Sequence, residues 1–141
     1  MWFLSIILSA VIIGGAASTV TLPSPPELRM TPPAADLPPE VTAFFGTWEG
    51  TWDGVLPSRL VVEEIDATSA RVVYAWADDP KGRFKAGWSR VRAKILPGGA
   101  LQWGSDVRFT FKMAADRRSI EGEREQAEHI SLVTMQKIER E

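Results

Sequence analysis

The run GTWEGTWDG at residues 46–54 decides the fold of this chain. Because successive side chains of a β-strand point to opposite faces, the run predicts a strand with one buried face and one wet face. Glycine between large tryptophans is costly in a flat strand, but it suits a strand that coils sharply or lets another segment approach closely. The first strand of a closed barrel has that need. The buried face would carry Gly46, Trp48, Gly50, Trp52 and Gly54, and the wet face Thr47, Glu49, Thr51 and Asp53.

Strand-like runs continue to residue 138, separated by turn signals about every ten to twelve residues. Broken alternation in the second run predicts a bulge near Glu63 and Glu64. The last run is apolar on both faces and fits either register. Residues 40–45 predict one helical turn that sets Phe44 or Phe45 against one end of whatever follows. The strands are predicted at residues 46–54, 59–66, 70–77, from about 84 or 86 to 95, 101–103, 107–113, 119–125 and about 129–138.

Eight short strands joined by tight turns predict an all-β antiparallel meander. A sheet that long leaves two exposed edges unless it closes, and eight strands close into a barrel with room for side chains or one small ligand. We therefore predict an eight-stranded up-and-down β-barrel over residues 40–141, with an open sandwich as the alternative.

Two segments precede the barrel. Residues 2–17 carry no charge and lead into small residues that suit a signal peptidase, so residues 1–18 predict a signal peptide and a periplasmic or secreted protein. The apolar run is short for a membrane span of about 20 residues, and it lacks the usual basic residue before it. An uncleaved membrane anchor and a buried N-terminal helix stay open as alternatives, and a membrane contact is expected only through this leader.

Residues 19–39 contain seven of the ten prolines. Proline fixes φ and removes a hydrogen-bond donor, so this segment predicts an extended, semi-rigid linker. It would either hold the barrel away from a membrane or partner, or act as a simple spacer.

Composition excludes several kinds of chemistry. The net charge of −2 gives no overall field for nucleic acid, and the chain has no cysteine. His129 is the only histidine, so no metal site is expected, and no nucleophile-elbow pattern is present. Glu63 and Glu64 should point to opposite faces of a strand, and Asp78 and Asp79 indicate a turn. These features predict a protein that is not an enzyme and that needs no cofactor or metal.

The pair Gly46 and Trp48 after a short helical turn resembles the lipocalin signature, and the repeated Gly-x-Trp pattern is similar to small lipocalin-like modules of exported bacterial proteins. The resemblance to the calycin superfamily covers residues 40–138. The domain departs from it in being short, in lacking a helix after the last strand and in having no Thr-Asp-Tyr motif. Avidin's biotin-binding residues are not recognisable. In lipocalins an arginine packs over the first-strand tryptophan, and the resemblance assigns that role to Arg124, with Lys137 as second choice.

The main functional hypothesis is a barrel that binds a small apolar or amphipathic ligand, with Arg124 facing an anionic headgroup. The alternative is a structural or protein-interaction module whose lumen is filled by the same side chains. Oligomeric state is not predicted. The candidate ligand-binding residues are Trp48, Trp52, Tyr74, Trp76, Phe109, Phe111 and Arg124.

Charge is unevenly distributed along the barrel sequence. Residues 40–79 hold eight acidic and two basic side chains, whereas residues 80–118 hold ten basic and two acidic ones. The cations are expected either to pair with carboxylates on neighbouring strands or to form a patch for an anionic partner. The candidate patch is one face of the strand that ends at residue 95, namely Trp88, Arg90, Arg92 and Lys94.

Overall fold

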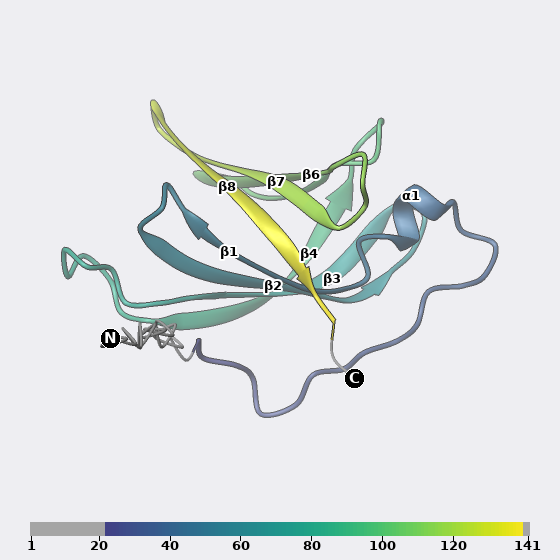
Figure 1. The fold of residues 1–141 in the computed structure, drawn as a ribbon, viewed down its shortest axis with the longest axis horizontal. Coiled ribbons are helices and arrows are strands. Elements are labelled where there is room, and N and C mark those ends of the chain that lie inside the picture. The colour runs from purple at the N-terminus through teal and green to yellow at the C-terminus, as the bar shows by residue number, and fades with distance from the viewer. Residues whose placement is uncertain (1–21, 140–141) are drawn as a thin grey trace, which may run out of the picture.

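Each strand pairs with its neighbour along the chain, and the last strand pairs with the first (Figure 1). The computed structural model describes residues 22–139, so the predictions for residues 1–18 lie outside the described residues. Within that range eight antiparallel strands form a closed up-and-down barrel, which confirms the predicted fold and excludes the sandwich. The elements are α1 (Pro39–Thr42), β1 (Gly46–Trp52), β2 (Leu56–Ile65), β3 (Ser69–Trp76), β4 (Gly87–Ile95), β5 (Leu101–Gly104), β6 (Val107–Met113), β7 (Ser119–Gln126) and β8 (His129–Ile138).

One end of the barrel is closed by α1 and the residues after it. Proline suits the first turn of a helix because its missing N–H has no partner there, and Pro39 begins α1. Phe44 is 1% exposed beside the barrel core, and its carbonyl accepts a hydrogen bond of 2.9 Å from the Trp48 indole. The Nζ of Lys137 lies 5.5 Å from the centre of the Trp48 ring. Lys137 therefore occupies the position that the resemblance gave first to Arg124.

Details of the strands both confirm and correct the sequence-based expectations. The bulge is present, as a register shift between Val62 and Glu64. The second strand begins at Leu56, earlier than the predicted residue 59, and Pro57 lies inside it opposite Thr51. The open register of β8 is resolved by burial: Val133 and Met135 are buried, while Ile130 and Leu132 are exposed on the outer face.

Residues 22–31, which we call the N-terminal strap, lie against the outer wall of the barrel. Leu22 is buried with Ala75 and Ala77. The Thr31 N–H donates a hydrogen bond of 2.8 Å to the Glu63 carbonyl. Figure 1 shows this segment in purple, running below β2 and reaching the end where α1 lies. Residues 22–31 of the predicted linker therefore pack on the barrel wall.

A buried carboxylate fixes the strap. Glu63 is fully buried although it is on the outer wall, and it accepts hydrogen bonds from Arg90 Nε at 2.8 Å and from the Arg29 N–H at 2.6 Å. Arg71 pairs with Glu63 at 3.4 Å and with Glu64 at 2.7 Å. The expectation that Glu63 and Glu64 point to opposite faces is therefore wrong. The bulge lets both carboxylates reach the same arginine.

This environment makes the strap sensitive to acid. Burial alone would raise the pKa of Glu63, but the Arg90 hydrogen bond, the Arg29 N–H and the charges of Arg90 and Arg71 outweigh it, so the pKa lies below its ordinary value of 4.5. A lowered folded-state pKa means that the carboxylate stabilises the protein above its unfolded pKa, and that this stability is lost as the pH falls through the folded pKa.

We expect Glu63→Gln to lower the free energy of unfolding by about 1–3 kcal/mol at neutral pH, because Arg71 and Arg90 lose the buried negative charge and one of its two acceptor oxygens. The gap to wild type should shrink as the pH falls below about 4.5, the ordinary Glu63 pKa, because the unfolded chain then binds a proton that folded Glu63, with its lowered pKa, does not yet bind. Urea unfolding across this pH range measures the gap. Glu64→Gln is the matched control and should cost less, since Glu64 is 42% exposed. A Glu63→Gln gap that does not depend on pH would contradict the assignment.

Candidate functional site: a cavity at the open end

The end opposite α1, which we call the mouth, opens into a cavity of about 500 Å³ inside the barrel. The turns between β1 and β2, β3 and β4, β5 and β6, and β7 and β8 surround it. Its volume falls within the roughly 300–1,000 Å³ of small-molecule sites. The lining residues are Trp52, Asp53, Val55, Leu56, Tyr74, Trp76, Asp79, Lys81, Arg83, Phe84, Ser89, Trp103, Phe109, Arg124 and Ser131.

Aromatic rings form the inner wall of this cavity. Phe109 stacks on its cross-strand partner Trp103 at 4.9 Å with an interplanar angle of 13°, and Tyr74 lies 4.8 Å from Phe109. The Trp52 indole donates a hydrogen bond of 3.0 Å to the Tyr74 hydroxyl. The Tyr74 hydroxyl also lies 3.4 Å from the Ser58 hydroxyl. These contacts fix the rings before any ligand arrives, so binding would require little ordering of the wall.

The cavity also contains a cation on its wall. Arg124 is on β7, opposite Phe109 on one side and Ser131 on the other, and it donates a hydrogen bond of 3.0 Å to the Gln126 amide oxygen. Among residues 22–139, no carboxylate forms an ion pair with Arg124. Burial raises the pKa of Tyr74, against smaller opposing effects of Ser58, Trp52 and the Arg124 charge, so Tyr74 is a neutral hydroxyl beside this cation at neutral pH.

The structure brings together five of the seven sequence-predicted ligand-binding residues, namely Trp52, Tyr74, Trp76, Phe109 and Arg124. The other two, Trp48 and Phe111, are fully buried in the closed half of the barrel and do not line the cavity. Phe111 packs behind the cavity wall, with its ring centre 5.4 Å from that of Trp103, and Trp48 packs beside Phe44 at the closed end.

Several cavity residues were not predicted as site residues. Trp103 lies in a strand of only four residues, and its inward position shows only in the pairing with Phe109. Val55 and Phe84 lie in turns, where strand alternation carries no information. The sequence contained one signal for Trp103 as a cavity residue: its short strand precedes the strand that carries the inward Phe109.

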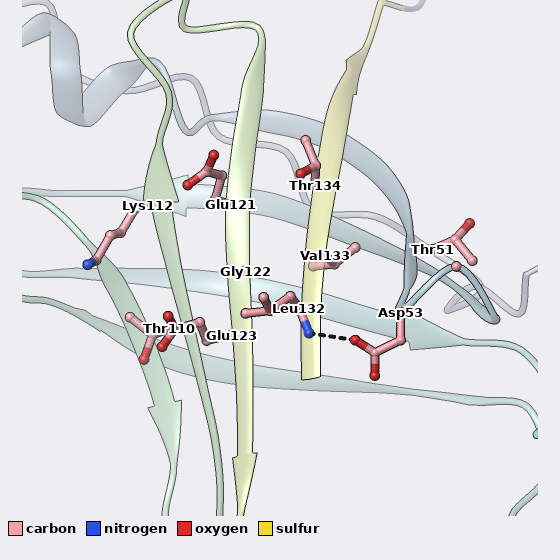
Figure 2. Close-up of a pocket in the computed structure, with 11 residues that line it drawn as sticks. Thr51, Asp53, Thr110, Lys112, Glu121, Gly122, Glu123, Leu132, Val133 and Thr134 are labelled. Atoms are coloured by element: carbon pink, nitrogen blue, oxygen red, sulfur yellow. Dashed lines mark hydrogen bonds between the residues drawn. The ribbon is translucent and has the colours of Figure 1, made fainter. Parts of the chain in front are cut away.

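A second hollow, of about 410 Å³, lies over β6, β7 and β8 on the outer wall (Figure 2). Its sides include Thr110, Lys112, Glu121 and Glu123. At its edge the Asp53 carboxylate accepts a hydrogen bond of 2.9 Å from the Leu132 N–H, drawn as a dashed line in Figure 2. Threonines and charged side chains are typical of a solvated outer face, so the aromatic cavity is the stronger candidate site.

The outer face of β4 carries the predicted basic patch, but its cations are not equally available. Arg90 is held by Glu63 and by the Glu27 carbonyl, and it lies 5.8 Å from the Trp88 ring centre. Arg92 donates a hydrogen bond of 3.0 Å to the Ser69 hydroxyl and is exposed, as is Lys94. Binding of an anionic partner there stays a prediction, and Arg90 already has an intramolecular role.

The turn between β3 and β4 uses its two aspartates to hold itself together. Asp79 forms an ion pair of 2.6 Å with Arg83, and Asp78 accepts a hydrogen bond of 2.6 Å from the Ala86 N–H. The hydrogen bond from Arg83 is the main cause that lowers the pKa of Asp79 to about 2. Across residues 22–139, no group of three or more His, Cys, Asp or Glu side chains is placed to hold a metal ion.

The fold and the site together define a closed eight-stranded antiparallel barrel that is packed at one end and hollow at the other. Comparisons with protein-family models, curated proteins and solved structures give no significant match. In the described part of the chain, no helix has the length and apolar character needed to cross a bilayer.

Proposed function

We propose that this protein is an exported, non-enzymatic barrel that binds a small amphipathic ligand with an anionic headgroup in the mouth cavity. The observation that carries the proposal is Arg124, a cation on the wall of an aromatic cavity, for which residues 22–139 provide no ion-pair partner. The apolar part of the ligand would lie against Trp103 and Phe109, and the headgroup would face Arg124. The likeness of residues 46–52 to lipocalin-like modules supports the same class of function.

Ligand selectivity tests this proposal. We expect decanoate to bind the protein more tightly than decanol, with a change in tryptophan fluorescence because Trp52, Trp76 and Trp103 line the cavity. Arg124→Gln should weaken decanoate binding by about tenfold, equal to about 1.4 kcal/mol, and leave decanol binding almost unchanged. Arg108→Gln is the matched control, since Arg108 is exposed on the neighbouring strand β6.

A second variant tests whether the ligand binds in the cavity or on the outer wall. Ser131→Trp should fill the cavity and abolish binding of both probes, because Ser131 lines it and is not part of the closed-end core. Equal binding by wild type and Ser131→Trp would place the ligand elsewhere. If neither probe binds, and native mass spectrometry of protein from its own host shows no co-purifying ligand, the alternative of an interaction module replaces the proposal.

A further inference from the structure

The exposed apolar side chains of the barrel are gathered at one end. In residues 22–139 the large apolar side chains that remain exposed are Met30, Val55, Phe84, Trp88, Ile130 and Leu132. Met30 belongs to the strap. All the others lie on the mouth half of the barrel: Val55 and Phe84 in its turns, Trp88 near the start of β4, and Ile130 and Leu132 near the start of β8. The closed-end turns carry none of these side chains.

Some of these side chains are half or more exposed. Val55 is 58% exposed, Ile130 62% and Leu132 56%. Single exposed apolar residues are common on protein surfaces, but a group confined to one end of a molecule indicates a surface that is covered by an apolar partner. Tryptophan is also enriched at membrane–water interfaces, and Trp88 is 38% exposed on this half of the barrel.

The position of the strap determines which end of the barrel lies nearest to the residues before Leu22. Leu22 is buried beside Ala77, directly after β3, and it also packs near Leu56, the first residue of β2, so it lies at the mouth. Residues 2–17 of the sequence are uncharged and mostly apolar. Four residues lie between Ala17 and Leu22, so the five Cα–Cα steps that join them span at most about 18 Å when extended.

The closed end is farther from this apolar sequence. A ten-residue strand such as β2 rises about 33 Å, and barrel strands tilt by roughly 40°, so the two ends of the barrel are about 25 Å apart. The hydrogen bonds of Glu63 to Arg29 and Thr31 prevent the strap from lifting off to extend this reach. The sequence leaves an uncleaved membrane anchor open for residues 2–17, and a bilayer that holds this anchor would lie at the mouth.

We propose that in the full-length chain the mouth of the barrel rests on a lipid bilayer, with Val55, Phe84 and Trp88 in contact with its surface. Acidic and basic side chains are mixed around the mouth, with Asp53, Asp79, Lys81 and Arg83 all lining it. Apolar contact, rather than attraction to anionic lipid, therefore holds the barrel in place. The cavity then opens toward the membrane, where amphipathic molecules are concentrated.

The absence of cysteine from the chain allows a direct test of orientation. Full-length protein is reconstituted with phosphatidylcholine vesicles and carries an environment-sensitive fluorophore on one introduced cysteine. Val55→Cys reports from the mouth, and Ala67→Cys, exposed in the turn between β2 and β3, reports from the closed end. We expect a blue shift and protection from iodide at position 55, and neither effect at position 67, with little dependence on salt.

A double variant, Phe84→Ser with Trp88→Ser, should restore iodide access at position 55 while the protein stays bound to the vesicles through residues 2–17. The same response at positions 55 and 67, or at neither, would overturn the proposal. A shift at position 55 that needs no vesicles and grows with protein concentration would show that a second copy of the chain covers the mouth. Decanoate binding is measured separately, so failure here leaves the cavity proposal standing.

Discussion

Trp48→Ala should lower the free energy of unfolding by about 3–5 kcal/mol, which is a large share of the roughly 5–15 kcal/mol available to a whole domain. Trp48 has no exposed surface and packs in the core of the closed end. Its removal also leaves the Phe44 carbonyl without its indole donor and Lys137 without the ring beneath it. Neighbouring side chains cannot easily fill the space that the Trp48 ring leaves, because the strands around it are fixed by pairing on both sides.

Thermal and urea unfolding measure this effect, and two variants show its origin. Trp48→Phe keeps a ring in the core but loses the hydrogen bond to Phe44, so it should cost less than Trp48→Ala. Trp88→Ala removes the same residue type from a position that is 38% exposed, and its cost should stay below about 1 kcal/mol. Equal losses at positions 48 and 88 would mean that burial at the closed end does not control stability.

Strand alternation carried the fold prediction because a barrel wall has one dry and one wet face along nearly its whole length. The run at residues 107–113 places Phe109 and Phe111 inward, as predicted. Alternation could not distinguish the two halves of the lumen. Trp48 and Trp52 share one face of β1, yet Trp48 packs in the closed end and Trp52 lines the cavity. The difference depends on α1 and Phe44, which cover only one end.

The outer wall was harder to predict, because its burial comes from the strap. Glu63, Val61, Val73 and Ala75 are buried although they face outward, since residues 22–31 lie over this wall. Proline-rich composition predicts an extended chain but does not tell whether that chain is free or packed on a neighbour. The unequal charge of residues 40–79 and 80–118 did predict ion pairs between strands, and Glu63 from the acidic range pairs with Arg90 from the basic range.

Gly50→Val should prevent the barrel from closing. The sequence suggests two reasons, the close approach of another segment and a collision with the neighbouring rings, and the structure supports the first. Glycine between Trp48 and Trp52 predicts a collision with the two rings. The structure instead places a Cβ at position 50 only 2.6 Å from the Thr134 carbonyl oxygen and 2.9 Å from Met135. The Thr134 carbonyl oxygen is a backbone atom of β8. This oxygen cannot move without separating β8 from β1, and the two strands pair only at residues 47–50 of β1.

Even Gly50→Ala is therefore expected to reach or exceed the upper end of the roughly 1–3 kcal/mol typical of overpacking, and Gly50→Val should exceed it. Gly54→Ala is the control for backbone strain without collision, because Gly54 has a φ of +71° and a Cβ there meets nothing within 4 Å. Its cost should be about 1–2 kcal/mol. Hydrogen exchange of the β8 amides should rise in Gly50→Ala and stay near wild type in Gly54→Ala. If both variants keep their β8 protection, close contact between β1 and β8 is not what closes this barrel.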